Sequence, residues 1–357
     1  MNALDELTSL VSDGQNLTEV QASRAAQSLA DGGIDPDSKK SFLIAFSEKG
    51  ETSAEVTAFA ATFREVAINP GVELWAERAV DVCGTGGDGS STFNISTAVS
   101  FVVAAAGVPV FKHGNRSITS KCGSADLLEG LGIRLDLDGG AIRESLRELN
   151  FCFFFAPAFH PAFKEIMPVR KALAAEGKRS IFNLLGPLIN PGRPAHQLLG
   201  VFAPQWVEPV AAALGSLGLS AGLVVHGKPE PGRALDELSC AGENVIAGFG
   251  RLERGAGSLT ASAAGLPECR FSDLAGGNLE ENIELLNRLF EGGHPAVPSG
   301  LRDTVLLNAG AALWACGKAV DLKEGIQISD TLVSGGEVAG WLRRAREFNA
   351  DLPANDG

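Results

Sequence analysis

A glycine-rich run followed by hydroxyl side chains is the first group of residues suited to binding a charged ligand. Gly84, Gly86, Gly87 and Gly89 follow a short apolar stretch, and Ser, Thr and Asn side chains crowd positions 90–97. Glycine lets backbone N–H groups approach an anion closely, and the N-terminus of a following helix adds donors and a favourable dipole. The spacing fits neither the dinucleotide fingerprint GxGxxG nor the Walker pattern, so it predicts another kind of phosphate site. A tight turn with a helix cap is the alternative.

Cations gather in a second run, at 112–124, directly after another apolar stretch. Lys112, Arg116 and Lys121 share this run with His113 and several hydroxyl side chains. The whole chain carries 43 Asp and Glu against 30 Lys and Arg, a net charge of −13. Local positive charge in so acidic a chain predicts an anion-binding loop at the C-terminal end of a strand, where open α/β sheets bind ligands. A solvated basic loop is the alternative.

Two further segments supply an apolar wall and an acidic pair. His160 and Arg170 are the polar residues of a mostly apolar, aromatic stretch. One guanidinium in such a wall suits a planar substrate that carries a carboxylate, although a core loop with a salt-bridged arginine fits equally well. Asp236 and Glu237 are adjacent, after an apolar run that ends near His226. Adjacent carboxylates can hold Mg²⁺, but an acidic pair is common in an acidic chain.

Two parts of the chain, which differ in their hydrophobic pattern, must position these segments. Residues 1–70 show helical periodicity and no strand pattern, which predicts a small all-α unit. From about residue 75, short apolar strands alternate with helices, which predicts a larger α/β domain with a mostly parallel central sheet flanked by helices. The expected strands are 79–82, 108–111, 151–155, 198–202 and 222–226. The expected helices after residue 75 are 97–106, 124–131, 141–149, 207–217, 280–290, 303–316 and 337–348.

Composition excludes several classes of protein. At 357 residues, 45% hydrophobic and 20% charged, the chain is of ordinary globular type. Its acidity speaks against nucleic acid and anionic membranes as partners. Six cysteines without a CxxC pair predict free thiols in a reducing compartment. The acidic start is no secretory signal, and the longest apolar run, 101–111, is too short to span a bilayer. We therefore expect a cytoplasmic protein with no membrane partner.

Taken together and in this order, the segments resemble the anthranilate phosphoribosyltransferase family. The matching runs are 84–88, 94–97, 112–117, 160–162, 168–170, 182–188, 236–237 and 303–309. The resemblance implies a helical domain of residues 1–74 with about 164–186, through which the family forms homodimers. It implies an α/β phosphoribosyltransferase domain of 75–163 with 187–357. Any association with anthranilate synthase components is left open.

The resemblance also implies a reaction. Family members transfer the phosphoribosyl group of phosphoribosyl pyrophosphate (PRPP) to the amine of anthranilate and release pyrophosphate, in the second step of tryptophan synthesis from chorismate. They require Mg²⁺, which we expect as two ions per subunit. Charge on the leaving group would be offset by metal and cations, so catalysis would rest on positioning and electrostatic stabilisation, with no covalent nucleophile.

Carried over by position, the family's site falls on four groups of residues. Those that would line PRPP are Gly84, Gly87, Asp88 and Thr92. Those that would hold its pyrophosphate and 5-phosphate are Asn94, Ile95, Ser96, Thr97, Lys112, His113, Gly114, Asn115, Arg116, Ser117, Ile118, Thr119, Ser120 and Ser124. The Mg²⁺ ligands would be Ser96, Asp236 and Glu237. Asn115 and Arg170 would bind anthranilate near Gly84, and His113 and His160 would border its tunnel. His113 and Lys112 are the candidate catalytic residues, His113 as general base if one is needed.

The chain departs from the family's pattern in two places. The segments 171–181 and 228–235 are longer than usual, and both flank the acceptor or metal side, so they bear on acceptor choice. One alternative is a same-fold phosphoribosyltransferase or pyrimidine nucleoside phosphorylase with another acceptor, whose loop differs from 112–115. The other is a non-catalytic paralogue that binds nucleic acid, which should be basic where this chain is acidic.

Overall fold

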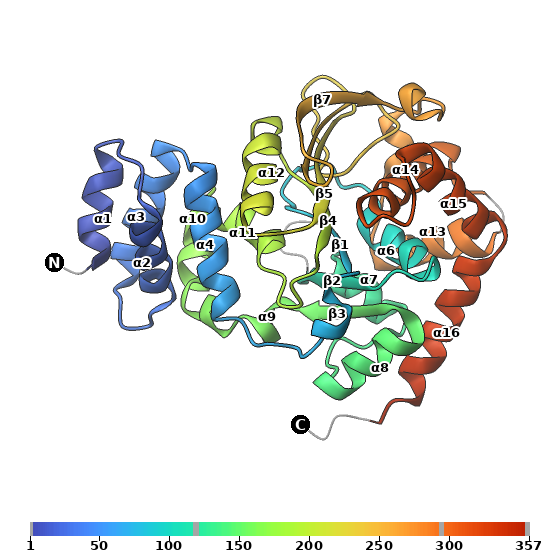
Figure 1. The fold of residues 1–357 in the computed structure, drawn as a ribbon, viewed down its shortest axis with the longest axis horizontal. Helices are drawn as coiled ribbons and strands as arrows, with labels where there is room; N and C mark the ends of the chain where they lie inside the picture. Colours follow the sequence, from blue (N-terminus) through green and yellow to red (C-terminus); the bar gives the residue numbers. More distant parts are fainter. Residues whose placement is uncertain (1–2, 117–120, 293–295, 354–357) are drawn as a thin grey trace.

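A seven-stranded sheet forms the centre of the computed structural model, which describes residues 3–116, 121–292 and 296–353 (Figure 1). The strand order in this described part is β3-β2-β1-β4-β5-β6-β7. The strands are β1 Val80–Gly84, β2 Val110–Gly114, β3 Phe151–Phe155, β4 His196–Gly200, β5 Ala221–Lys228, β6 Glu243–Gly250 and β7 Arg254–Thr260. β1 to β5 pair in parallel, whereas β6 and β7 pair antiparallel at one edge. The predicted fold class is therefore confirmed.

The direction in which strands are added reverses between β1 and β4. From β1 the chain proceeds outward to β2 and β3, then returns to place β4 on the other side of β1 and β5 beyond it. The loops that leave the C-terminal ends of β1 and β4 thus part in opposite directions. In open α/β sheets such a switch point leaves a crevice for a ligand.

Alternate side chains of the strands face two different cores. Val82 and Leu198 belong to a core that includes α6 Ile95–Ala105 and α14 Ser299–Ala315. Cys83 and Leu199 face the opposite core, which includes α12 Val207–Ser216. This alternation follows from the two-residue period of a strand and explains why the central strands are apolar on both faces.

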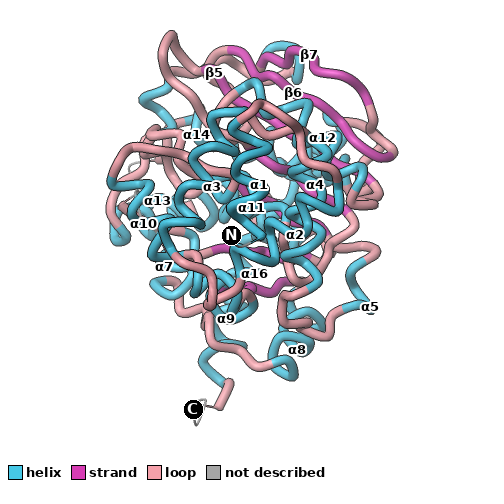
Figure 2. The backbone as a smooth tube through the Cα atoms, turned by 90° about the vertical axis from the view of Figure 1, so that its left-hand side faces the viewer, coloured by secondary structure: helices cyan, strands magenta, loops and turns pink. Residues whose placement is uncertain are grey.

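The N-terminal helices form a bundle to one side of the sheet (Figure 1), and this side faces the viewer in Figure 2. They are α1 Ala3–Ser12, α2 Glu19–Ala30, α3 Pro36–Lys49 and α4 Ser53–Glu65. Thr18 and Thr52 begin α2 and α4 with reciprocal capping boxes. Two later helices, α10 Met167–Ala175 and α11 Phe182–Leu188, bury their apolar faces in the same core as α1 to α4.

The remaining elements lie around the sheet and in part against the bundle, where residues 161–165 contact α2 and α10. They are α5 Glu73–Ala76, α7 Ser124–Gly130, α8 Gly139–Leu149, α9 Ala156–Phe159, η1 Pro161–Glu165, η2 Pro204–Trp206, η3 Ser262–Ala264, η4 Phe271–Leu274, α13 Leu279–Glu291, α15 Leu322–Ser334 and α16 Glu337–Asp351. Sequence periodicity does not predict β6, β7 or α15. β7 is an exposed edge strand without apolar alternation, and α15 contains Gly325, whose added Cβ would lie 2.3 Å from the carbonyl oxygen of Gly310 in α14. None of the described helices is long and apolar enough to cross a membrane.

Candidate active site

The glycine loop, residues 84–89, leaves β1 at the switch point and is held in place by Asp236 of the acidic pair, Asp236 and Glu237. The N–H of Gly86 donates to Oδ2 of Asp236 at 2.6 Å, and a Cβ on Gly84 would lie only 2.1 Å from that oxygen. Gly86, Gly87 and Gly89 have φ of 70°, 75° and 71°, the left-handed region that favours glycine. An added Cβ on any of these three would meet nothing within 4 Å, so the loop presents an open backbone surface on which an anion fits.

The acidic pair follows β5 and reaches the N-terminus of α6. Oε1 of Glu237 accepts from the N–H of Ser96 at 3.2 Å. Burial raises the pKa of Glu237 to about 7, against the opposing influence of Lys112 and Ser96. Burial, together with the charges of Asp88 and Glu237, raises the pKa of Asp236 well above its ordinary value. Lys112 offsets only part of the charge of these two buried carboxylates, and a divalent metal would offset more of it.

The described residues do not form a complete metal cage. No three His, Cys, Asp or Glu side chains among them converge closely enough to hold an ion. Ser96, Asp236 and Glu237 offer only oxygen ligands, as Mg²⁺ prefers, and Mg²⁺ usually completes its shell with water and substrate phosphates. The donor set therefore fits Mg²⁺ that arrives with a phosphorylated substrate.

Lys112 lies beneath this site rather than on the loop surface. It is 2% exposed, and its Nζ donates to the carbonyl of Val82 at 3.0 Å and to Oγ of Ser96 at 3.5 Å. Burial lowers the pKa of Lys112, while nearby Asp81, Cys83 and Glu237 raise it. The ammonium group thus supports the α6 N-terminus and the acidic pair from within the protein.

Asp81 forms a buried network of charged side chains with Lys112 and Glu237. Burial raises its pKa to about 6, although Nδ2 of Asn190 donates to its Oδ2 at 2.9 Å and Lys112 is nearby. The other carboxylate oxygen of Asp81 has no hydrogen-bond partner among the described residues. The network links the interior of the sheet to the edge where the glycine loop begins.

Two histidines lie against each other behind the cationic loop, as we call the segment 112–124. The rings of His113, on β2, and His160 are 5.1 Å apart, and the residues are 8% and 4% exposed. Their Nε2 atoms have no hydrogen-bond partner among the described residues. Burial, then the neighbouring His160, lowers the pKa of His113 to about 3, and burial lowers that of His160 to about 4. Both rings are therefore neutral near pH 7 and have a free nitrogen to offer a ligand.

Arg170, on α10, completes the apolar wall. Its guanidinium carbon lies 6.0 Å and 5.6 Å from the ring centres of Phe163 and Phe182. Burial lowers the pKa of Arg170, and it forms no salt bridge with any residue of the described part. Of the two interpretations left open by the sequence, the structure favours an unpaired guanidinium over a salt-bridged core arginine. A guanidinium without a carboxylate partner, beside aromatic rings, suits a flat molecule that carries a carboxylate.

Other predicted residues are placed around the cationic loop. Arg116 points toward α7, where it donates to Asp126 at 3.2 Å and to Glu129 at 2.8 and 3.0 Å. Hydrogen bonds from the Arg116 guanidinium to the Glu129 and Asp126 carboxylates raise the pKa of Arg116. Asn115 accepts from the N–H of Arg116 through its Oδ1 at 2.8 Å. Ser117, Ile118, Thr119 and Ser120 lie outside the described residues.

The remaining predicted residues flank the start of α6. Nδ2 of Asn94 donates to the carbonyl of Cys122 at 3.1 Å, which ties the glycine loop to the cationic loop. Oγ of Ser124 would lie 2.6 Å from a Cβ on Gly114, so these two residues are in close contact. Asp88 accepts from Oγ of Ser90 at 2.5 Å, and Ser90 and Thr92 hydroxyls are 3.3 Å apart. Ile95 and Thr97 are fully buried, and Oγ1 of Thr97 has no hydrogen-bond partner among the described residues.

Sequence reasoning missed one contact at this edge. Arg179, in the long segment after α10, donates from Nη2 to the carbonyl of Gly87 at 2.8 Å. Its guanidinium carbon also lies 4.1 Å from the ring centre of Phe202. The segment that carries Arg170 is thereby tied to the glycine loop. No signal in the sequence separates Arg179 from the lysine and arginine residues around it.

Comparisons with known proteins agree with this geometry. The model of the glycosyl transferase family, helical bundle domain, matches residues 6–67, and that of the glycosyl transferase family, a/b domain, matches residues 76–339. The chain is 42% identical over 348 residues to anthranilate phosphoribosyltransferase of Symbiobacterium thermophilum, covering 96% of this chain and 97% of that protein. It is 41% identical to the enzyme of Rhodopseudomonas palustris, covering 94% and 95%.

Solved structures show the same fold. The crystal structure of anthranilate phosphoribosyltransferase from Thermus thermophilus matches with a TM-score of 0.87 at 40% identity, covering 96% of this chain and 99% of that chain. The enzyme from Saccharomyces cerevisiae in complex with PRPP and Mg matches with a TM-score of 0.77 at 24% identity, covering 96% and 94%. At 24% identity, the match to the Saccharomyces cerevisiae structure shows that the fold is shared.

Proposed function

Because this chain belongs to the anthranilate phosphoribosyltransferase family, we propose that it transfers the phosphoribosyl group of PRPP to the amine of anthranilate. The products are N-(5-phosphoribosyl)anthranilate and pyrophosphate. The observation that carries the acceptor is Arg170, an unpaired guanidinium between two phenylalanine rings, which suits an aromatic carboxylate. The two alternatives, a nucleoside phosphorylase and a nucleic-acid-binding paralogue, are not favoured by relatives of about 40% identity over nearly the whole chain.

The donor side is built for a phosphorylated sugar. The open backbone of Gly87 and Gly89 offers N–H donors to phosphate oxygens, and the dipole of α6 favours an anion nearby. Ser96, Asp236 and Glu237 would hold Mg²⁺, which would offset charge on the departing diphosphate. Two ions per subunit remain our expectation, which rests on the resemblance to the family.

Transfer to the acceptor amine needs little general acid–base catalysis. The anthranilate carboxylate would pair with Arg170, with its ring against Phe163 and Phe182 and its amine directed toward the sugar. Asn115 is the second residue that we assign to the acceptor. Burial lowers the pKa of His113 to about 3, so its Nε2 is only a weak base near pH 7. Rate acceleration then depends on holding amine and sugar carbon in line, because an arylamine is nucleophilic in its neutral form.

The same family membership leads us to propose the domain division, the assembly and the location. Residues 1–74 with about 164–186 would form the dimerisation domain, which is supported by the core that α1 to α4 share with α10 and α11. We propose a homodimer through this domain. We also propose a cytoplasmic location, which is supported by six free cysteines.

Anthranilate fluorescence tests the activity directly. Purified protein should abolish the fluorescence of anthranilate only when PRPP and Mg²⁺ are both present, and omission of either should stop the decay. Salicylate, which keeps the carboxylate but lacks the amine, should inhibit without being consumed. A steady anthranilate signal in the complete mixture would refute the proposed reaction.

A further inference from the structure

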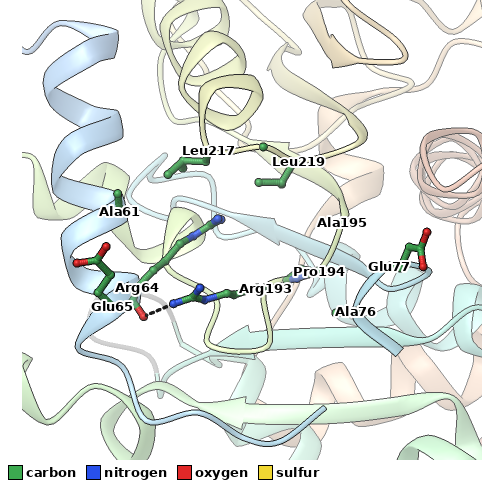
Figure 3. Close-up of a pocket in the computed structure, with 11 residues that line it drawn as sticks. Ala61, Arg64, Glu65, Ala76, Glu77, Arg193, Pro194, Ala195, Leu217 and Leu219 are labelled. Atoms are coloured by element: carbon green, nitrogen blue, oxygen red, sulfur yellow. Dashed lines mark hydrogen bonds between the residues drawn. The ribbon is translucent and has the colours of Figure 1, made fainter. Parts of the chain in front are cut away.

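A second pocket lies at the opposite end of β4 from the candidate active site. It has a volume of about 390 Å³ and is lined by α4, by the residues before β4 and by the turn between α12 and β5 (Figure 3). The pocket therefore lies where the helical bundle meets the sheet. It shares no lining residue with the glycine loop, the acidic pair or the histidine pair.

Two arginines line one side of this pocket without a carboxylate partner. Nε of Arg64 donates to the carbonyl of Leu188 at 2.6 Å, and Nη2 of Arg193 donates to the carbonyl of Arg64 at 3.1 Å. Neither arginine forms a salt bridge with a residue of the described part. Burial, and then the nearby charge of Arg193, lowers the pKa of Arg64 to about 10, although the charge of Asp81 partly opposes this. Two like charges held together in this way favour an anion between them.

The backbone at Arg193 is held in an unusual conformation. Its φ is 48°, in the left-handed region, which a side chain such as arginine seldom adopts. Asn190 enforces it, because its carbonyl accepts from the N–H of Arg193 at 3.1 Å and its Oδ1 accepts from the N–H of Gly192 at 3.0 Å. A strained residue fixed by its neighbours is a common feature of ligand sites.

The rest of the pocket limits what the anion can be. Leu217 and Leu219 form an apolar side opposite the arginines (Figure 3). Glu65 and Glu77 are exposed at the two ends of the lining and point away from the guanidiniums. Their charges disfavour a polyanion, while the leucines favour an apolar body. We propose that this pocket binds a small organic molecule with one carboxylate and an apolar body, held by Arg64 and Arg193.

Calorimetric titration with benzoate and acetate tests the site on the whole protein. Benzoate should bind to the wild type at least about tenfold more tightly than acetate, because only its ring reaches the leucines. Arg193→Asn keeps a residue that tolerates left-handed backbone but removes one cation, and it should weaken benzoate binding about tenfold or more. Ala61→Leu fills the pocket from α4 without changing charge, and it should have the same effect. Arg24→Gln, at an exposed position on α2, is the charge-matched control and should bind benzoate as the wild type does.

The design separates this pocket from the acceptor site, which benzoate can also enter. Binding that disappears in both Arg193→Asn and Ala61→Leu, with transferase activity retained, supports the proposal. If both variants bind benzoate as the wild type does, all of the binding belongs elsewhere and the proposal is overturned. An equal loss in Arg24→Gln would attribute the effect to net charge and would overturn it too. Acetate bound as tightly as benzoate would overturn the apolar part.

Discussion

Gly200, the last residue of β4, is the position at which a single methyl group should disable the site. An added Cβ would lie 1.5 Å from the carbonyl oxygen of Asp236 and 2.1 Å from its carbonyl carbon. Carbon and oxygen seldom approach within about 3 Å, so in Gly200→Ala the backbone at Asp236 must retreat by roughly 1.5 Å. Asp236 and Glu237 move with it, away from the glycine loop and the N-terminus of α6.

The size of the effect follows from that displacement. A misplacement of about 1 Å in a catalytic group lowers rates by roughly 100-fold, so kcat/KM for PRPP should fall by about 100-fold or more. Overpacking should also destabilise the protein by about 1–3 kcal/mol, too little to unfold a domain of ordinary stability. The apparent affinity for Mg²⁺ should fall together with the activity.

Gly215 supplies the matched control. It lies in α12, where an added Cβ would come no closer than 3.8 Å to Cβ of Phe249, an ordinary contact. Gly215→Ala should therefore keep full activity and gain about 0.5–1 kcal/mol, because alanine favours a helix. The measurements are anthranilate fluorescence decay at varied PRPP and Mg²⁺, and thermal unfolding. If folded Gly200→Ala retains wild-type kcat/KM for PRPP, the assigned role of the acidic pair is wrong.

Three further perturbations probe other parts of the site. Arg170→Gln should raise KM for anthranilate by about 10- to 100-fold and leave KM for PRPP unchanged in steady-state kinetics; a larger effect on PRPP would contradict its assignment. Arg179→Gln removes the contact with Gly87, and KM for PRPP should rise about fivefold, whereas no change would show that this contact does not order the glycine loop. Burial raises the pKa of Glu237 from 4.5 to about 7, so without metal its contribution to stability is greatest at low pH and is lost as pH rises from 4.5 through 7. Mg²⁺ competes with that proton, and the increase in melting temperature that Mg²⁺ and PRPP produce should grow between about pH 5.5 and 8 by several degrees; an increase independent of pH would argue against Glu237 as a ligand.

The sequence predicts best the elements whose signal lies in consecutive residues. It predicts β3 at its observed bounds, Phe151–Phe155, because five consecutive apolar residues bounded by turn signals suit a buried strand. It does not predict α15, because Gly325 resembles a helix breaker, although it is the residue that lets α14 and α15 approach each other. β7 lacks alternation because one of its edges is free and its side chains are exposed.

The same distinction applies to the site. The glycine loop and the acidic pair are each continuous in the sequence, so their residue types mark them as candidates, and the order of motifs shared with the family assigns their roles. The direction of a long side chain is not encoded locally, and this is why the sequence assigns Arg116 to phosphate although in the structure it pairs with Asp126 and Glu129 on α7. Lys112 is likewise expected on a loop, but it lies on β2 beneath α6. The role of Arg179 depends on a contact between residues 92 positions apart.

The way in which α10 and α11 complete the N-terminal bundle has a consequence during synthesis. α4 ends at Glu65, but the last helix that packs on the shared core, α12, ends at Ser216. The ribosome adds about 5–20 residues per second, so the first four helices wait roughly 8–30 s for the last of their covering helices. Throughout that interval Phe42, Phe46 and Phe59 belong to a nascent bundle with one open side. The newborn chain therefore exposes an apolar surface that chaperones can bind, until the residues of α12 emerge.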